Sequence, residues 1–326
     1  MKGLLSPLGI VVARVYAWLP ATVDRRVRVI AWITLACQIL IVGTGGAVRL
    51  TGSGLGCPTW PRCTEGSFVA LPEQGFHGVI EFGNRLLTFV LAVVAILAFL
   101  WVLKLRRERR DLFRLALVIG AGIPAQAVLG GITVLTGLNP HLVGAHFLVS
   151  VVLVALSTVL VFRVYFGPVV RQRMFPVWLV ATTHVTSLFV AITIVVGVLT
   201  TGSGPHAGDA ETPRNGLDAA VLQHFHSYPG YITVGLTIAI LVSAIVLRAP
   251  RLRFFAVALL VVEVGQVVVG VVQARLGLPE LLVGIHMVLA CMLVAAMTAV
   301  VLSLRSPVTA QRAASATPGE RVTVGV

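Results

Sequence analysis

Two histidines lie inside long apolar stretches of this 326-residue chain, where an ionisable side chain is costly. His146 ends the run Leu-Val-Gly-Ala-His, and His286 ends the run Leu-Val-Gly-Ile-His 140 positions later. Imidazole in the interior of a helical bundle is a typical axial ligand of heme iron, and two imidazoles can hold one iron from both sides. We therefore expect both residues to bind heme. The alternative is that they only form hydrogen bonds between helices.

A second set of polar residues occupies equivalent places in the two copies of this pattern. The segment Glu81–Asn84 stands in the first half where Gln223–His226 stands in the second. His226 is thus expected to join His286 as the second ligand of one heme. The first half offers His146, but an amide stands where its second histidine would be.

Other histidines leave alternatives open. His224 competes with His226, but the register of the repeat favours His226, and two residues along a helix turn a side chain by about 200°. His77 and His141 lie near the outer membrane boundary. They are either interfacial, or they reach a heme propionate or replace the missing ligand. His206 falls in an outer loop and is expected to be solvated.

Glu81 is the costliest single residue within an apolar stretch. Buried carboxylates often act as proton donors or acceptors, so we expect a catalytic role. The alternative is an ion pair with Arg85, one helical turn further on. Glu263 has no acidic counterpart in the first half and is expected to form a structural hydrogen bond.

Cys57 and Cys63 flank a short segment that contains two prolines, in a loop expected to face the outside. Two cysteines this close in an oxidising compartment should form a disulfide. A thiolate metal site would need further ligands nearby.

These residues must be positioned by membrane helices. The chain is 57% hydrophobic and only 11% charged, against roughly 25% charged residues in soluble domains. A membrane helix needs about 20 mainly apolar residues. Eight stretches qualify, which predicts an all-α integral membrane protein with eight transmembrane helices, at about 29–50, 78–103, 115–136, 142–164, 176–199, 220–247, 254–273 and 281–304.

The net charge of +13 permits two readings, a nucleic-acid surface or a topology signal. Of the 25 Lys and Arg residues, 20 fall on one side of the predicted spans. This bias indicates that both termini are cytoplasmic in a cell membrane, and it argues against nucleic acid as a partner. Five lie outside or near the outer boundary: Arg49, Arg62, Arg85, Arg214 and Arg275.

The repeat predicts two four-helix halves in the same orientation, that is, two parallel-repeat four-helix bundles. Each bundle should hold any cofactor between its facing helices. The expected segments are a cytoplasmic, interfacial N-terminal segment (1–28), an N-terminal half (29–164) with an outer loop (51–76), a cytoplasmic linker (165–175), a C-terminal half (176–304) and a disordered cytoplasmic tail (305–326).

From about residue 30 to 304 the chain resembles the heme A synthase family. The resemblance rests on Gly45–Cys63 (GGAVRLTGSGLGCPTWPRC), on Ile80–Arg85 (IEFGNR) and on the duplicated histidine spans. It implies an eight-helix membrane enzyme that converts heme O to heme A for cytochrome oxidase. The reaction oxidises a ring methyl group to a formyl group by successive hydroxylations.

The resemblance also implies roles for individual residues. The C-terminal half would hold heme b through His226 and His286. The N-terminal half would bind the substrate heme, with Glu81 catalytic and His146 as iron ligand, and the loop cysteines Cys57 and Cys63 match the cysteine pair of the family. Further substrate-heme contacts are expected from Asn84, Arg85, Arg49 and His77.

Asn84 departs from the family pattern, because many members carry histidine at that position.

Expected partners are a heme O synthase, cytochrome oxidase assembly factors, an electron donor that the sequence leaves unknown, and the lipid bilayer. Homo-oligomers are compatible with the resemblance. Two other classes compete with the enzyme: a non-catalytic di-heme electron-transfer protein, and a transporter, which the internal repeat suggests but the outer position of the polar residues disfavours.

Overall fold

The computed structural model describes residues 13–14, 16–209 and 211–307. Within these ranges eight helices are long and apolar enough to cross a membrane, as the sequence predicts. The all-α class is confirmed. The helices are α2 (Arg25–Leu50), α3 (Gly75–Val102), α4 (Arg110–Leu135), α5 (Pro140–Phe166), α6 (Val177–Ser203), α7 (Ala219–Val246), α8 (Pro250–Arg275) and α9 (Glu280–Ser303), with short 3₁₀ turns at η1 (Pro72–Gln74) and η2 (Lys104–Arg106).

Side chains placed just before the helices set several of their first turns. The carboxylate of Asp24 accepts hydrogen bonds from backbone N–H groups at the start of α2, and Asp218 does the same for α7. Asn139 caps α5, whose first residue is Pro140. These caps satisfy N–H groups that have no partner within the helix.

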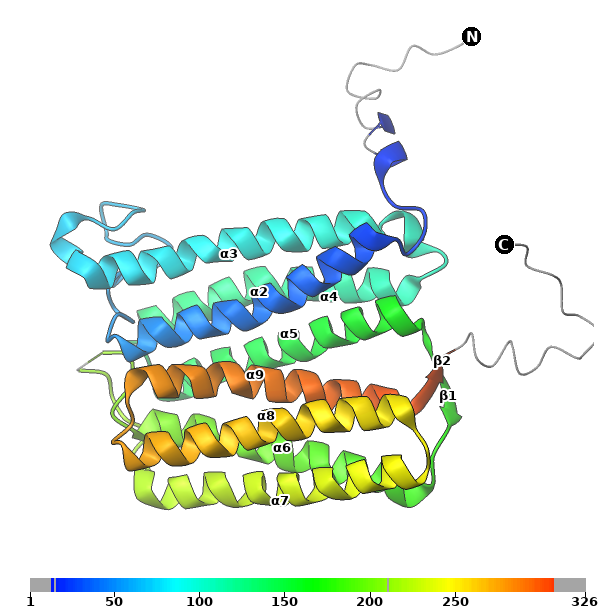
Figure 1. Cartoon of the computed structure of the whole chain (residues 1–326). Helices are drawn as coiled ribbons and strands as arrows, with labels where there is room; N and C mark the ends of the chain where they lie inside the picture. The colour runs from blue at the N-terminus through cyan, green and yellow to red at the C-terminus, as the bar shows by residue number, and fades with distance from the viewer. Residues whose placement is uncertain (1–12, 15, 210, 308–326) are drawn as a thin grey trace, which may run out of the picture.

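The helices lie side by side in one block (Figure 1). Helices α2, α3, α4 and α5 contact one another in a ring, and α6, α7, α8 and α9 form a second group. The two groups meet where α9 packs against α2 and α5. Their origin as copies of one repeat stays a prediction.

Each group has its own apolar core. One buried cluster includes Ala31, Leu112 and Val154 from the first group. A second includes Leu179, Ile240 and Leu259 from the second group. Phe147 of α5 packs against both clusters, so the two groups share a continuous apolar contact.

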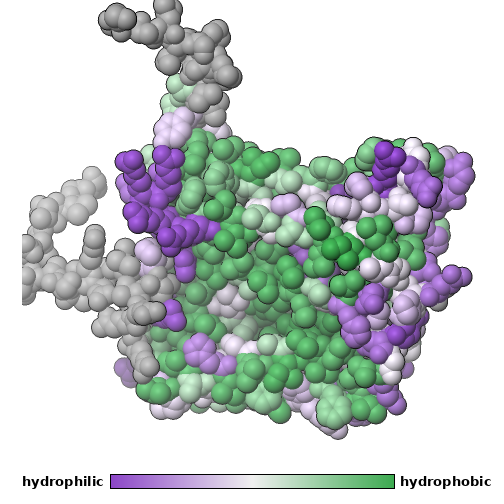
Figure 2. Space-filling model, turned by 180° about the vertical axis from the view of Figure 1, so that it is seen from behind, coloured by the Kyte–Doolittle hydropathy of each residue, from purple (hydrophilic) through white to green (hydrophobic). Residues whose placement is uncertain are grey.

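The outer faces of the helices are apolar as well. Phe89 and Val246 are 69% and 73% exposed, and Figure 2 shows hydrophobic surface along the flank, with hydrophilic residues gathered at the two ends. Such a surface would be costly in water over this area but suits lipid. The protein is a multi-pass membrane protein.

The structure differs from the prediction at the segments that join and end the helices. The expected linker contains strand β1 (Val169–Arg173), which pairs antiparallel with β2 (Arg305–Pro307). The first three residues of the expected disordered tail are therefore ordered, because β1 satisfies part of their backbone hydrogen bonding. The rest of that tail and residues 1–12 of the expected interfacial segment lie outside the described residues. Residues 16–18 of that segment are helical.

Candidate functional site

A cavity of about 720 Å³ lies within the second group of helices. Helices α6, α7, α8 and α9 line it, and α5 contributes Gly144 and Phe147. Most of its wall is apolar, with residues such as Val190, Ile194 and Leu293. An apolar cavity of this size, with a few polar groups, suits a large flat ligand.

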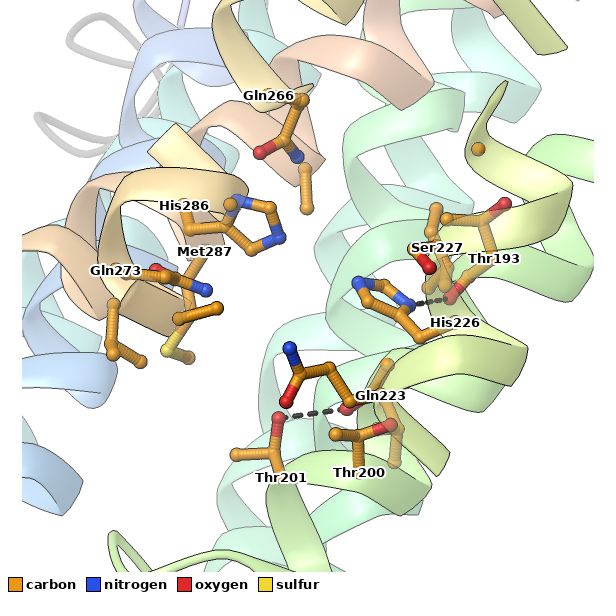
Figure 3. A pocket seen from close by; sticks show the side chains of 18 of the residues that line it. Thr193, Thr200, Thr201, Gln223, His226, Ser227, Gln266, Gln273, His286 and Met287 are labelled. Carbon is orange, nitrogen blue, oxygen red and sulfur yellow. Dashed lines mark hydrogen bonds between the residues drawn. The ribbon is translucent and has the colours of Figure 1, made fainter. Parts of the chain in front are cut away.

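His226 of α7 and His286 of α9 point toward one another from opposite walls of this cavity (Figure 3). Their ring centroids are 6.0 Å apart. Metal–nitrogen bonds to histidine are about 2 Å long. Two bonds of this length, plus the distance from each ring centroid to its nitrogen, add up to about the observed separation of the two centroids. One iron therefore fits between the two histidines.

Hydrogen bonding selects the nitrogen of His226 that is available to a metal. Its Nδ1 lies 2.8 Å from the carbonyl oxygen of Thr193. Because a carbonyl can only accept, Nδ1 must carry the proton in this bond, and Nε2 of the neutral ring keeps its lone pair. On the opposite wall, Nδ1 of His286 is buried and has no hydrogen-bond partner among the described residues.

Glycines on the neighbouring helices make room for both rings. A Cβ atom at Gly197 would lie 2.7 Å from Cε1 of His226, and one at Gly270 would lie 3.2 Å from Cε1 of His286. The first distance is too short for any side chain. These close approaches explain why glycine stands at each place.

The alternative histidines are not part of this facing pair. His224 lines the same cavity but is exposed, and its Nδ1 lies 2.9 Å from the carbonyl oxygen of Ala220, on its own helix. His141 is also exposed. The structure therefore brings His226, rather than His224, opposite His286, as the repeat register predicts.

Arg49, at the end of α2, lies at the rim of the same cavity. Its Nε donates to the carbonyl oxygen of His206 at 2.6 Å, and its Nη2 donates to that of Thr201 at 2.9 Å. The sequence predicts Arg49 as a contact of the first-half site, but the end of α2 leans against the loop after α6 and carries Arg49 to the second group. Arg275 also lines the cavity, so more than one arginine stands at its rim.

His206 is not solvated as expected. It is half-buried, and its Nε2 lies 2.8 Å from the carbonyl oxygen of Leu278. The Arg49 guanidinium and the Leu278 carbonyl replace water as hydrogen-bond partners of this loop.

Glu81 occupies a different place, in the first group. It is 5% exposed, and its carboxylate accepts hydrogen bonds from the backbone N–H of Cys57 and from Arg85. Arg85 also donates to the carbonyl oxygens of Cys57, Thr59 and Arg62. The ion pair considered as an alternative role is therefore present, within a network that ties the outer loop to α3.

Cys57 and Cys63 are joined by a disulfide, as predicted. Both cysteines are completely buried. In the same loop, Trp60 lies directly against Gly131 of α4, where a Cβ atom would overlap its indole ring. Trp60 belongs to the motif that carries the resemblance, but its type alone did not indicate this contact with α4.

The remaining predicted residues of the first group lie on two helices, α3 and α5. On α5, His146 packs against Gly130, and its Nδ1 is buried with no hydrogen-bond partner among the described residues. Asn84 accepts a hydrogen bond from the Thr44 hydroxyl at 2.8 Å. His77 lies 2.9 Å from the hydroxyl of Ser53, measured from Nδ1.

Glutamines add polar groups that were not predicted as site residues. Gln126 donates to the carbonyl oxygen of His146 at 3.0 Å. Its counterpart Gln266 and also Gln273 line the second-half cavity, each with a buried side-chain oxygen that has no partner in the described structure. The duplicated Gln-x-x-x-Gly pattern was the signal that could have found Gln266.

Glu263 accepts a hydrogen bond from Thr237 at 2.8 Å, the structural bond expected for it.

Fold and site together define a class: a multi-pass helical membrane protein that presents a facing pair of histidines in an apolar cavity between its helices. The chain belongs to the COX15-CtaA family, described as cytochrome oxidase assembly protein, whose model matches residues 28–298. This match confirms the family resemblance seen in the sequence.

Curated relatives agree with this assignment. A heme A synthase of Listeria welshimeri is 28% identical over 134 residues, covering 41% of this chain and 44% of the relative. A heme A synthase of Geobacillus thermodenitrificans is 30% identical over 158 residues (48% and 49%), and one of Bacillus cereus is 33% identical over 144 residues (42% and 46%). In these alignments the chain spans about half the length of the curated relatives it matches.

Proposed function

We propose that this protein is a heme A synthase, which oxidises a ring methyl group of heme O to the formyl group of heme A. The observation that carries the proposal is the facing pair His226 and His286 in an apolar cavity, in a chain of the COX15-CtaA family. Relatives named heme A synthase support the substrate.

The second group of helices is proposed to hold heme b through His226 and His286. The residues fit this group, because the cavity is large and apolar, two glycines leave space for the imidazoles, and His226 is oriented by the Thr193 carbonyl. When bound, a bis-histidine heme supplies reversible one-electron chemistry. Arg49 and Arg275 stand where they can bind the heme carboxylates through charge-assisted hydrogen bonds.

The first group is proposed to bind the substrate heme, with His146 as its iron ligand and Asn84, Arg85 and His77 as further contacts. Glu81 already accepts hydrogen bonds from Cys57 N–H and from Arg85, and neither bond gives it a proton to donate. The Glu81 carboxylate is therefore suited to accept a proton from a group on the methyl carbon that reacts, or to stabilise positive charge near that carbon. The network through Arg85 would keep its carboxylate in place.

We infer the topology from charge. The positive-inside bias places both termini on the cytoplasmic side of the cell membrane, and the disulfide loop on the outer side. In this orientation the cavity rim, Glu81 and Arg85 all lie near the outer boundary. Oxidase assembly factors, a heme O synthase and an electron donor are the proposed partners, and a homo-oligomer is compatible with this scheme.

The test is the heme content of cells that make heme O but lack their own heme A synthase. Expression of this chain should cause heme A to appear among extracted hemes separated by chromatography, and the purified protein should show a heme b spectrum. Heme b in the protein without heme A in the cells would instead identify a non-catalytic di-heme electron-transfer protein. Absence of heme from the purified protein would contradict both.

A further inference from the structure

A second, smaller hollow lies far from the histidine cavity, at the end of the bundle where both described ends of the chain lie (Figure 1). It is a groove of about 280 Å³ between α4 and α5. The residues that line it are Asp111, Arg114, Leu115, Val118, Leu156 and Arg163.

The groove combines an apolar side with a basic end. Leu115, Val118 and Leu156 form the apolar side, and Val118 is 52% exposed on the lipid-facing flank of α4. Arg114 and Arg163 stand at the end of the groove where α4 begins and α5 finishes. A molecule with a negative head and an apolar chain matches this division.

The one carboxylate in the groove does not neutralise both arginines. Asp111 is held by Arg109 through two hydrogen bonds of 3.0 and 3.1 Å. Arg163 comes no closer to it than 4.0 Å, and its Nε is buried with no hydrogen-bond partner among the described residues. Arg114 is exposed and forms no salt bridge in the described structure. The guanidinium groups of Arg114 and Arg163 thus still have N–H groups that can donate to a ligand.

The surroundings strengthen the positive field. Arg106, Arg107 and Arg110 precede the groove and are exposed. Figure 2 shows hydrophilic residues gathered in a compact patch at this end of the molecule, directly beside the hydrophobic flank. Basic pockets between membrane helices at this level are suited to anionic lipid head groups.

We propose that this groove binds an anionic phospholipid. The phosphate diester lies between the guanidinium groups of Arg114 and Arg163. One acyl chain follows Leu115, Val118 and Leu156 toward the middle of the membrane. A free phosphate ion would leave this apolar side without a partner, so the lipid is the occupant that satisfies both parts of the groove.

The experiment measures lipid retention by the full-length protein in nanodiscs made of equal parts phosphatidylcholine and phosphatidylglycerol, transferred to detergent and weighed by native mass spectrometry. The wild type should retain phosphatidylglycerol in preference to phosphatidylcholine. R114Q should retain it about tenfold less, because a charge-assisted hydrogen bond is lost. R110Q is the matched control, since it removes the same charge from an exposed arginine that does not line the groove.

Three results would overturn the proposal. Equal retention of the two lipids would show no anionic preference. An equal loss in R114Q and R110Q would show diffuse attraction to the basic surface. Displacement of the lipid by inorganic phosphate at matched concentration would show a site for a small anion. R114K, which keeps the charge, should restore most of the retention, and an unchanged melting temperature of R114Q would exclude misfolding as the cause of its loss.

Discussion

At the residue scale, the groups around His226 and His286 determine how the two imidazoles can bind a metal. Thr193 fixes one ring of the pair by hydrogen bonding, and the wall around both rings is mostly apolar. A neutral imidazole whose Nδ1 hydrogen is engaged presents Nε2 as a ligand in one orientation, which lowers the cost of ordering it when iron binds.

Loss of either histidine of the pair should remove heme b from the purified protein. H286A removes one imidazole of the facing pair, so we expect the low-spin bis-histidine absorbance spectrum to disappear and the heme content to fall by at least tenfold. H141A is the control, since His141 is exposed and does not line the cavity. Retention of the normal spectrum by H286A would contradict the assignment.

Glu81 should matter for catalysis more than for folding. E81Q keeps a side-chain oxygen for Cys57 N–H and Arg85 but removes the ability to accept a proton, so heme A production should fall by about 10²–10⁴-fold. Heme b content should be unchanged, because the pair that is proposed to bind it lies in the other group of helices. E73Q, which alters an exposed carboxylate that does not line the cavity, should leave heme A production near the wild-type level. Full activity of E81Q at normal heme loading would rule out the catalytic role.

At the element scale, function depends on how closely the helices approach one another. Gly197 on α6 lies against the ring of His226 on α7, and Gly270 on α8 lies against the ring of His286 on α9. The contact between each pair of helices thus fixes the place of one imidazole. The outer loop acts in the same way in the first group, where the backbone of Cys57, Thr59 and Arg62 holds Arg85.

Adding a methyl group at one of these close contacts between helices should displace the histidine ligand that lies against it. G197A places a methyl group 2.7 Å from Cε1 of His226, so the ring must move, and heme b affinity should drop by at least tenfold while the helix itself gains propensity. G235A is the matched control on α7, since nothing lies within 4 Å of the added methyl group. Titration of heme into the heme-free proteins, followed by absorbance, measures both. Equal affinities of the two variants would refute the packing argument.

At the scale of the whole molecule, the two groups of helices are joined at the end of the bundle where α2 and α6 finish. Arg49 of α2 bonds to the carbonyl oxygens of Thr201 and His206, and the N–H of Gly54 donates to the carbonyl oxygen of Gly208 at 2.9 Å. A residue of the first group therefore completes the rim of the cavity in the second. This joint offers a physical route by which the two sites can influence each other.

R49Q tests this joint. The substitution removes a positive charge and two hydrogen bonds from the rim, so heme b binding in the second group should weaken by about tenfold although the residue belongs to the first. R62Q, which neutralises an exposed arginine of the first outer loop, should leave heme b binding unchanged. The dissociation constant of heme b in detergent gives the comparison, and equal effects of the two variants would contradict a specific role for Arg49.

The eight spans, the all-α class, the family, the disulfide and the polar residues among apolar ones could all be predicted from the sequence. Each of these depends on composition or on neighbours close in the chain: a span needs about 20 apolar residues, and a short loop brings its own two cysteines together. His226 could be preferred over His224 for the same reason, because the turn of a helix is local.

Which of these residues contact one another could be read only from the folded protein. It placed Arg49 at the second-half cavity, folded His206 inward, set Trp60 against Gly131 and gave Glu81 both Arg85 and the backbone of Cys57 as partners. It also ordered residues 305–307 against β1. The reason is that rotation of a helix about its axis, and the path of a loop across another helix, depend on packing between segments far apart in the chain, which no local pattern records.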